Sequence, residues 1–371
     1  MADQEGRGGL CTPTRWRLIA SGVLLAACPL LVLLFERFGE ALSGGYRPFS
    51  KGLLSLQATV ASVAPFALWD FLVVGFALAA LFTLVRRVVR RRPLLPWLSV
   101  VLLVSSATLF LFVSGWALNH YAPSLANEIG LEVGVYTDDE LTAATRHYLE
   151  RAAALAPSVP RGEDGELLRQ DFYELARIAG GSYRELSESY GIFEGSQVPV
   201  KALLLLGEPL LLSGHVGIFF SPTGESSVPV NCAVADLPFT MCHEAAHRLA
   251  IAREQEANFA AFLACTTSDD VRFSYSGYYS AFSFCYGALR RSDPDRAARL
   301  LDEVRTSGLD AGVGLVLADL VATGRHYDAY EGWFGRIGSA VNDGYLRSFG
   351  EREGVKSYGL VVDYLIAWDR R

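Results

Sequence analysis

The chain has 371 residues, a formal net charge of −7, 51% hydrophobic residues and a mean hydropathy of +0.25. This composition is too apolar for an ordinary water-soluble protein, and the acidic balance excludes the basic globular surface that nucleic-acid binding requires. The charge is uneven, because residues 1–116 carry 11 Lys and Arg against 5 Asp and Glu, whereas the remainder carries 22 against 35. We therefore predict a membrane anchor at residues 1–120 and a water-exposed domain at residues 121–371.

Three apolar runs, at about residues 18–35, 66–85 and 98–118, have the length of transmembrane helices. The first run could also be a signal peptide, but no small-x-small cleavage site follows it closely and two more runs come after it. We interpret all three runs as membrane spans. Residues 36–65 are predicted to form a loop, whose second half is apolar enough to lie along the membrane surface.

Five arginines between Arg86 and Arg92 lie between the second and third runs. Basic loops of this kind stay in the cytoplasm. The N-terminus is then also cytoplasmic, and the chain after about Tyr121 is extracytoplasmic. Asp70, near the start of the second run, is predicted to be an interfacial carboxylate in contact with water. Trp116, at the end of the third, is interpreted as an interfacial aromatic residue.

The remainder of the chain predicts a mainly helical α+β domain with a small antiparallel or mixed sheet. A capping-box pattern at Thr137–Glu140 begins a helix that runs to about Leu155. Further predicted elements are helices at 166–179, 183–190 and 275–290, and strands at 198–206, 215–221 and 227–234. The last strand is the candidate edge strand that could pair with an extended substrate.

A metal-binding pattern follows these strands, at His243-Glu244-Ala245-Ala246-His247. On a helix, positions i and i+4 share a face, so both histidines can bind one metal ion. Glu244 is placed to take a proton from a metal-bound water. Apolar residues on both sides predict a buried helix, in which these polar groups are costly unless they are paired or metal-bound. This argument favours a zinc site over a polar surface patch.

A catalytic zinc site needs a third protein ligand, and Glu254 and Glu256 are the nearest candidates. An unbroken helix would place Glu254 roughly 10 Å beyond His247, so the helix must end near Ala250 and the chain must turn back. Asn258 lies one turn after Glu254 and could support a ligand histidine, which favours Glu254. The alternative for Glu256 is a solvated residue or a carboxylate favoured by the helix dipole.

Glu254-x-x-Ala257-Asn258 also resembles the E-x-x-A-D/N element of gluzincin peptidases, in which the first Glu is the third zinc ligand. The longer run from Pro238 to Phe259 resembles a bacterial family of membrane proteins, domain-of-unknown-function family 3810. That family usually has Gly at the position of Ala250. The resemblance extends to Pro65-Phe66, Trp116-x-x-Asn119-x-Tyr121, Tyr275-Ser276-Gly277-Tyr278 and Ser357-Tyr358-Gly359.

These observations predict a membrane-anchored zinc metallopeptidase that cleaves envelope or extracellular proteins or peptides. His243, His247 and Glu254 bind Zn²⁺, and Glu244 is the general base. The partners are the lipid bilayer and a peptide or protein substrate, with no nucleic acid. One alternative is a non-catalytic envelope protein with a structural or sensory zinc site, and another is an intramembrane protease. His215, His326, Tyr275 and Tyr278 are weaker candidates for the site.

Overall fold

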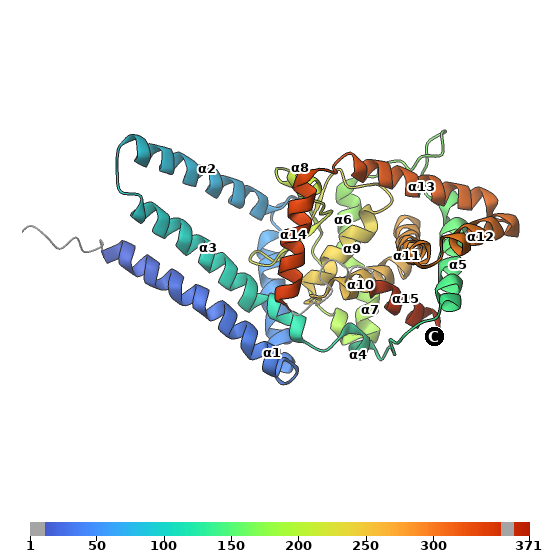
Figure 1. Cartoon of the computed structure of the whole chain (residues 1–371), viewed down its shortest axis with the longest axis horizontal. Coiled ribbons are helices and arrows are strands. Elements are labelled where there is room, and N and C mark those ends of the chain that lie inside the picture. Colours follow the sequence, from blue (N-terminus) through green and yellow to red (C-terminus); the bar gives the residue numbers. More distant parts are fainter. Residues whose placement is uncertain (1–11, 350–359) are drawn as a thin grey trace, which may run out of the picture.

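Three long apolar helices extend from one end of the molecule (Figure 1). The computed structural model describes residues 12–349 and 360–371. Helices α1 (Thr12–Ala61), α2 (Leu68–Val89) and α3 (Leu95–Gly115) are long and apolar enough to cross a membrane, with mean hydropathies of 2.6, 2.2 and 2.2 over their most apolar 18 residues. The expectation of three apolar helices is confirmed, with boundaries that differ by a few residues for the second and third.

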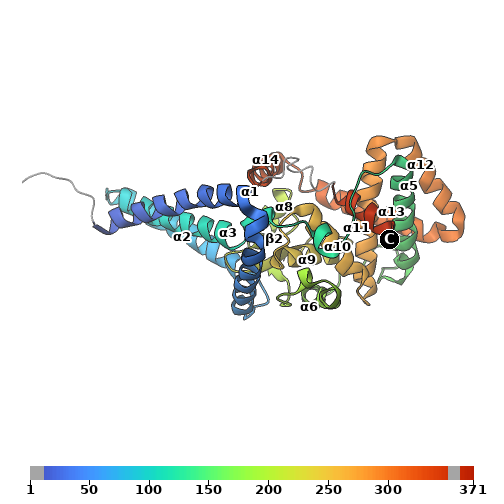
Figure 2. The ribbon, with the colours of Figure 1, turned by 90° about the horizontal axis from the view of Figure 1, so that it is seen from below.

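The predicted loop at residues 36–65 is wrong, because α1 continues to Ala61. Its ribbon bends sharply part way along, so that its second half runs crosswise to the first (Figures 1 and 2). Gly44, Gly45 and Pro48 lie in the helix, and such residues permit bends. Apolar side chains on this second half pack into the rest of the molecule, and Leu54 is fully buried. These contacts stabilise the segment as a helix.

The remaining chain forms a mainly helical body with a small sheet. Helix α5 begins with the predicted capping box, since Thr137 and Glu140 each bind the other's backbone N–H. Helix α6 begins at Phe172 rather than Glu166, because the Asp171 side chain caps it by accepting from the Glu174 amide. The helices are α4 (Leu125–Ile129), α5 (Asp138–Leu155), α6 (Phe172–Gly181), α7 (Arg184–Ser189), α8 (Gly207–Leu212), α9 (Leu237–Arg248), α10 (Glu254–Thr266), α11 (Val271–Ser292), α12 (Pro294–Val304), α13 (Asp310–Asp328), α14 (Trp333–Ser348) and α15 (Val361–Asp369).

The sheet is mixed, as expected, and its strands are β1 (Lys201–Leu203), β2 (Ile218–Phe220) and β3 (Glu225–Pro229). The order is β1-β3-β2, with β1 parallel and β2 antiparallel to β3. The prediction of an edge strand at Ser227–Val234 is therefore wrong, because β3 has a partner on each side. Strand β2 is an outer strand and packs beside α9.

Asp70 joins the second apolar helix to this sheet. Its carboxylate is fully buried and accepts the backbone N–H groups of Leu204, Leu205 and Leu206 at 2.9, 2.7 and 3.0 Å. The predicted contact with water is wrong, because these three donors take the place of water. In the reverse direction, the Glu225 carboxylate accepts the first N–H groups of α2. The division at residue 120 stays a prediction, but the start of α2 packs firmly against the sheet.

The core of the body gathers around α9, α10 and α11 (Figure 1). Helix α10 is buried from Glu256 to Cys265. The five described cysteines, Cys28, Cys232, Cys242, Cys265 and Cys285, are all free thiols. The region around α9 and α10 is therefore shaped by packing, with no disulfide among the described residues.

Candidate metal centre

Helix α9 places His243, Glu244 and His247 inside the body. All of its residues except His243 are buried, which agrees with the apolar sequence on both sides of the pattern. The helix ends at Arg248 and α10 begins at Glu254. The two helices therefore meet through a short turn that brings Glu254 back toward the histidines.

Ala250 makes this turn, as the sequence predicts. Its φ of 63° lies in the left-handed region, which is uncommon for a residue with a Cβ. The Ile251 N–H donates to the Ala246 carbonyl at 3.3 Å and closes the helix end. The left-handed conformation costs about 1–2 kcal/mol for alanine, so the surrounding packing must hold it in place.

Substitutions at Ala250 test how tightly this turn is constrained. Glycine stabilises the folded protein by relieving about 1–2 kcal/mol of backbone strain. It destabilises it by losing a buried methyl group, about 0.8 kcal/mol, and by making the unfolded chain more flexible, about 0.4–1 kcal/mol. We expect Ala250→Gly to change the free energy of unfolding by less than about 1 kcal/mol, whereas Ala250→Val should lose more than about 2 kcal/mol through overpacking and strain. Thermal unfolding of the full chain measures both, and a valine variant as stable as wild type would contradict this account.

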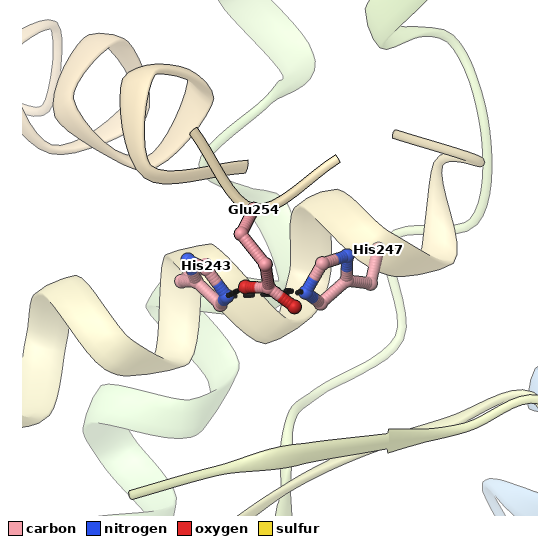
Figure 3. A group of neighbouring side chains, drawn as sticks. All are labelled: His243, His247 and Glu254. Carbon is pink, nitrogen blue, oxygen red and sulfur yellow. Dashed lines mark hydrogen bonds and ion pairs between the residues drawn. The ribbon is translucent and has the colours of Figure 1, made fainter. Parts of the chain in front are cut away.

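The three predicted ligand side chains meet at one point, as Figure 3 shows. The two histidine Nε2 atoms are 3.1 Å apart, and Glu254 Oε2 lies 3.2 Å from His243 Nε2 and 3.7 Å from His247 Nε2. Ligands at ~2 Å from a tetrahedral zinc ion are roughly 3.3 Å from one another. These three residues could therefore hold one metal ion with little movement.

The other nitrogen of each histidine is also fixed. His247 Nδ1 lies 2.8 Å from the Ile251 carbonyl, and His243 Nδ1 lies 2.8 Å from Asn258 Oδ1. A carbonyl oxygen can only accept, so His247 carries a proton on Nδ1. The Asn258 side-chain oxygen is also an acceptor, so His243 carries its proton on Nδ1 as well. Two Nε2 lone pairs then face each other at close range. That arrangement is repulsive unless a proton or a metal cation lies between them, and it is typical of metal-binding histidines.

The charges in the cluster favour a cation. Burial acts to lower the pKa of His247, but Glu254, with smaller contributions from Glu244 and the Ile251 carbonyl, raises that pKa to about 9. Burial acts to raise the pKa of Glu254, but His247 and His243 outweigh it and hold that pKa well below its ordinary value. Both shifts show that positive charge among these three side chains is stabilised by the carboxylate.

Glu244 lies beside the cluster and is not one of its three members. Its Oε2 is buried with no hydrogen-bond partner among the described residues. Burial raises the pKa of Glu244 to about 7, and the neighbouring histidines act against this rise. Gly217, just before β2, allows the sheet to approach, because a Cβ there would overlap the Glu244 carboxylate. The Glu244 carboxylate thus lies against the backbone just before β2.

Glu256 points elsewhere. It pairs with Arg253 at 2.9 Å and accepts a hydrogen bond from the Tyr364 hydroxyl at 3.3 Å. The structure therefore brings Glu254, and not Glu256, next to the two histidines. The site also lies in α9 and α10, outside the three helices that are apolar enough to span a membrane.

The end of α3 contacts the centre directly. The Trp116 indole N–H donates to the His247 carbonyl at 2.9 Å, and its ring packs against the His247 ring with centroids 5.6 Å apart. Trp116 is only 5% exposed, so its ring contacts protein at the end of α3, and its interpretation as an interfacial aromatic residue stays a prediction. Its indole N–H finds a buried acceptor in α9. Sequence spacing gave no signal for this contact, because 131 residues separate the pair.

The weaker candidates lie apart from the three ligand residues, with one exception. Tyr275 donates to Asp319, Tyr278 lies beside Arg151, and His326 packs on Tyr327. His215 lies within the electrostatic reach of Glu254, although burial is the larger influence and lowers the pKa of His215. Its Nδ1 is 2.9 Å from the Ser213 hydroxyl.

Comparison with known proteins identifies a family but no characterised relative. The family model described as "Protein of unknown function (DUF3810)" matches residues 46–366. No curated protein and no solved structure matches the chain. The match includes every residue of the candidate centre; of the positions that carry the resemblance, Ser357–Gly359 lie outside the described residues. Because the match covers most of the chain, the protein belongs to the family of proteins of unknown function DUF3810.

Proposed function

We propose that this protein is a membrane-anchored zinc-dependent metallopeptidase. The observation that carries the proposal is the convergence of His243, His247 and Glu254, with both histidine Nδ1 atoms already bound to oxygen acceptors. A set of two imidazoles and one carboxylate is typical of catalytic zinc sites, which keep one position open, whereas structural zinc sites use four protein ligands. The donor set therefore fits zinc and favours catalysis over a purely structural role.

Glu244 supplies the acid–base chemistry in this proposal. When bound, a zinc ion lowers the pKa of a coordinated water to about 7 and polarises a substrate carbonyl. Glu244 accepts a proton at Oε2, the oxygen without a partner among the described residues, and carries the proton to the leaving amine. Burial keeps the Glu244 carboxylate within reach of protonation near neutral pH, which suits a group that must both accept and donate.

The outer strand β2 supports a peptide as the substrate. Among the described strands, β2 pairs with β3 alone, so its other edge is the one that an extended chain could join. Gly217 precedes β2 and packs on Glu244. A peptide on this edge would therefore pass beside the proposed general base. We assign envelope or extracellular proteins or peptides as the substrate class, because the spans would hold the enzyme at the membrane.

Metal removal tests the activity. We expect the purified full chain to cleave peptides in an envelope extract, to lose this activity after dialysis against a zinc chelator, and to regain it with zinc but not with magnesium. The expectation follows from the nitrogen-containing ligand set, which suits zinc better than magnesium. Cleavage that persists after complete removal of zinc would contradict the proposal.

Sidedness is the second part of the proposal and rests on the five arginines between α2 and α3. We infer from this rule that the connection is cytoplasmic and that the metal centre is extracytoplasmic. A reporter enzyme that is active only outside the cytoplasm, fused after Arg371, is expected to be active. A stable but inactive fusion would reverse the orientation.

A further inference from the structure

Helix α14 carries a stripe of exposed apolar side chains. Trp333, Ile337 and Val341 follow one another at intervals of four residues and are 60%, 50% and 68% exposed. Together with Arg336 and Ala340 they line a shallow open depression. A neighbouring face of the helix packs on the body, where a Cβ at Gly338 would overlap the Ser213 carbonyl. A large apolar stripe on an outer helix face indicates an interaction surface.

The position of α14 identifies what this surface meets. Figure 2 shows α14 nearly end-on while the three apolar helices run across the view, so α14 lies crosswise to them. Its end contacts α3, since the rings of Tyr345 and Phe349 lie 5.9 and 6.2 Å from that of Phe112. Phe112 is in the last turn of α3, which ends at Gly115. Helix α14 thus lies at the level where the third apolar helix ends.

Other exposed apolar residues lie near the ends of the apolar helices α1 and α2. Leu204 and Leu205 are 47% and 44% exposed, and their amides bind Asp70 in the first turn of α2. Leu56 and Val60, on the crosswise second half of α1, are 63% and 66% exposed. Separate segments of the chain therefore present apolar side chains next to the apolar helices, as expected where a body meets a bilayer.

We propose that α14 is an amphipathic helix that lies in the interfacial layer of the bilayer, with Trp333, Ile337 and Val341 in contact with lipid. Helices of this kind lie parallel to the membrane plane and insert their apolar face about 5–10 Å. Tryptophan favours this layer, and Arg336 can extend toward the headgroups. This proposal does not depend on the proposed metal centre. Helix α14 does pack on Ser213, and the Ser213 hydroxyl contacts His215.

Photo-crosslinking of the full chain tests this surface. Benzoylphenylalanine replaces Ile337 in protein reconstituted into nanodiscs of phosphatidylethanolamine and phosphatidylglycerol, and adducts are identified by mass spectrometry. Leu81, 58% exposed on α2, is the positive control. Val135 is 97% exposed, and its carbonyl accepts a hydrogen bond from Arg370, next to the C-terminus, which lies on the side of the body away from the apolar helices (Figure 1). It is the matched control for an exposed apolar residue.

We expect lipid adducts at positions 337 and 81 and none at position 135. Failure to detect lipid at position 337, with adducts present at position 81, would overturn the proposal. Cross-links at 337 to a second copy of the chain would instead show that another protomer covers the stripe, and would also overturn it. Equal lipid adducts at 337 and 135 would show that contact is not specific to α14, which contradicts the proposal as well.

Discussion

Replacing Glu244 by Gln is expected to lower peptide turnover by about 10²–10⁴-fold, the usual contribution of general acid–base catalysis. Glutamine keeps the shape of the side chain but cannot accept the proton. Zinc content is expected to stay at the wild-type level, because His243, His247 and Glu254 remain. Melting temperature should hardly change, since Glu244 Oε2 has no hydrogen bond to lose among the described residues. The measurement is a cleavage assay on envelope extracts with zinc quantified in both proteins.

Glu256→Gln is the matched control for this experiment. Glu256 is a buried carboxylate of the same region, but it pairs with Arg253 and lies away from the histidines. Its variant is expected to keep turnover near wild type in protein that remains folded. Equal cleavage by wild type and Glu244→Gln would rule out the proposed mechanism. A structural or sensory zinc site predicts no cleavage by either.

Loss of any of the three ligands is expected to abolish stoichiometric zinc binding. His243→Ala, His247→Ala and Glu254→Ala each remove one of the three converging atoms and leave a site with two protein ligands. Glu256→Ala is expected to retain most of the zinc, since that carboxylate faces Arg253. Elemental analysis of the purified full-length variants distinguishes them. If Glu256→Ala lost the metal while Glu254→Ala kept it, the ligand set would be wrong.

Local rules made much of the centre predictable from sequence. The spacing of His243 and His247 fixes a shared helix face, and the distance to Glu254 requires a turn near Ala250. The structure has that turn, with Ala250 itself in the left-handed conformation. Asn258, chosen for its position one turn after Glu254, lies beside His243 Nδ1. Each of these relationships spans few residues, so helix geometry alone constrains it.

Relationships over longer distances could not be predicted in the same way. The order of the strands depends on which segments pair, and periodicity cannot distinguish the central β3 from the outer β2. The burial of Asp70 depends on amides 134–136 residues away. Trp116 meets His247 only because the third apolar helix ends against α9. Gly217 takes its role from contact with Glu244, which no local pattern reveals.

The central claim is that His243, His247 and Glu254 form a zinc site with an open position, and X-ray absorption at the zinc edge of the purified full chain tests it most directly. We predict one zinc per chain, bound by nitrogen and oxygen ligands at about 2.0–2.2 Å, with two imidazoles and no sulfur. Cys242 and Cys265 lie in the same core, but Cys242 Sγ contacts the Ser182 hydroxyl and neither sulfur belongs to the described group of ligand atoms. Absence of stoichiometric zinc, or a zinc–sulfur distance of about 2.3 Å, would contradict the account.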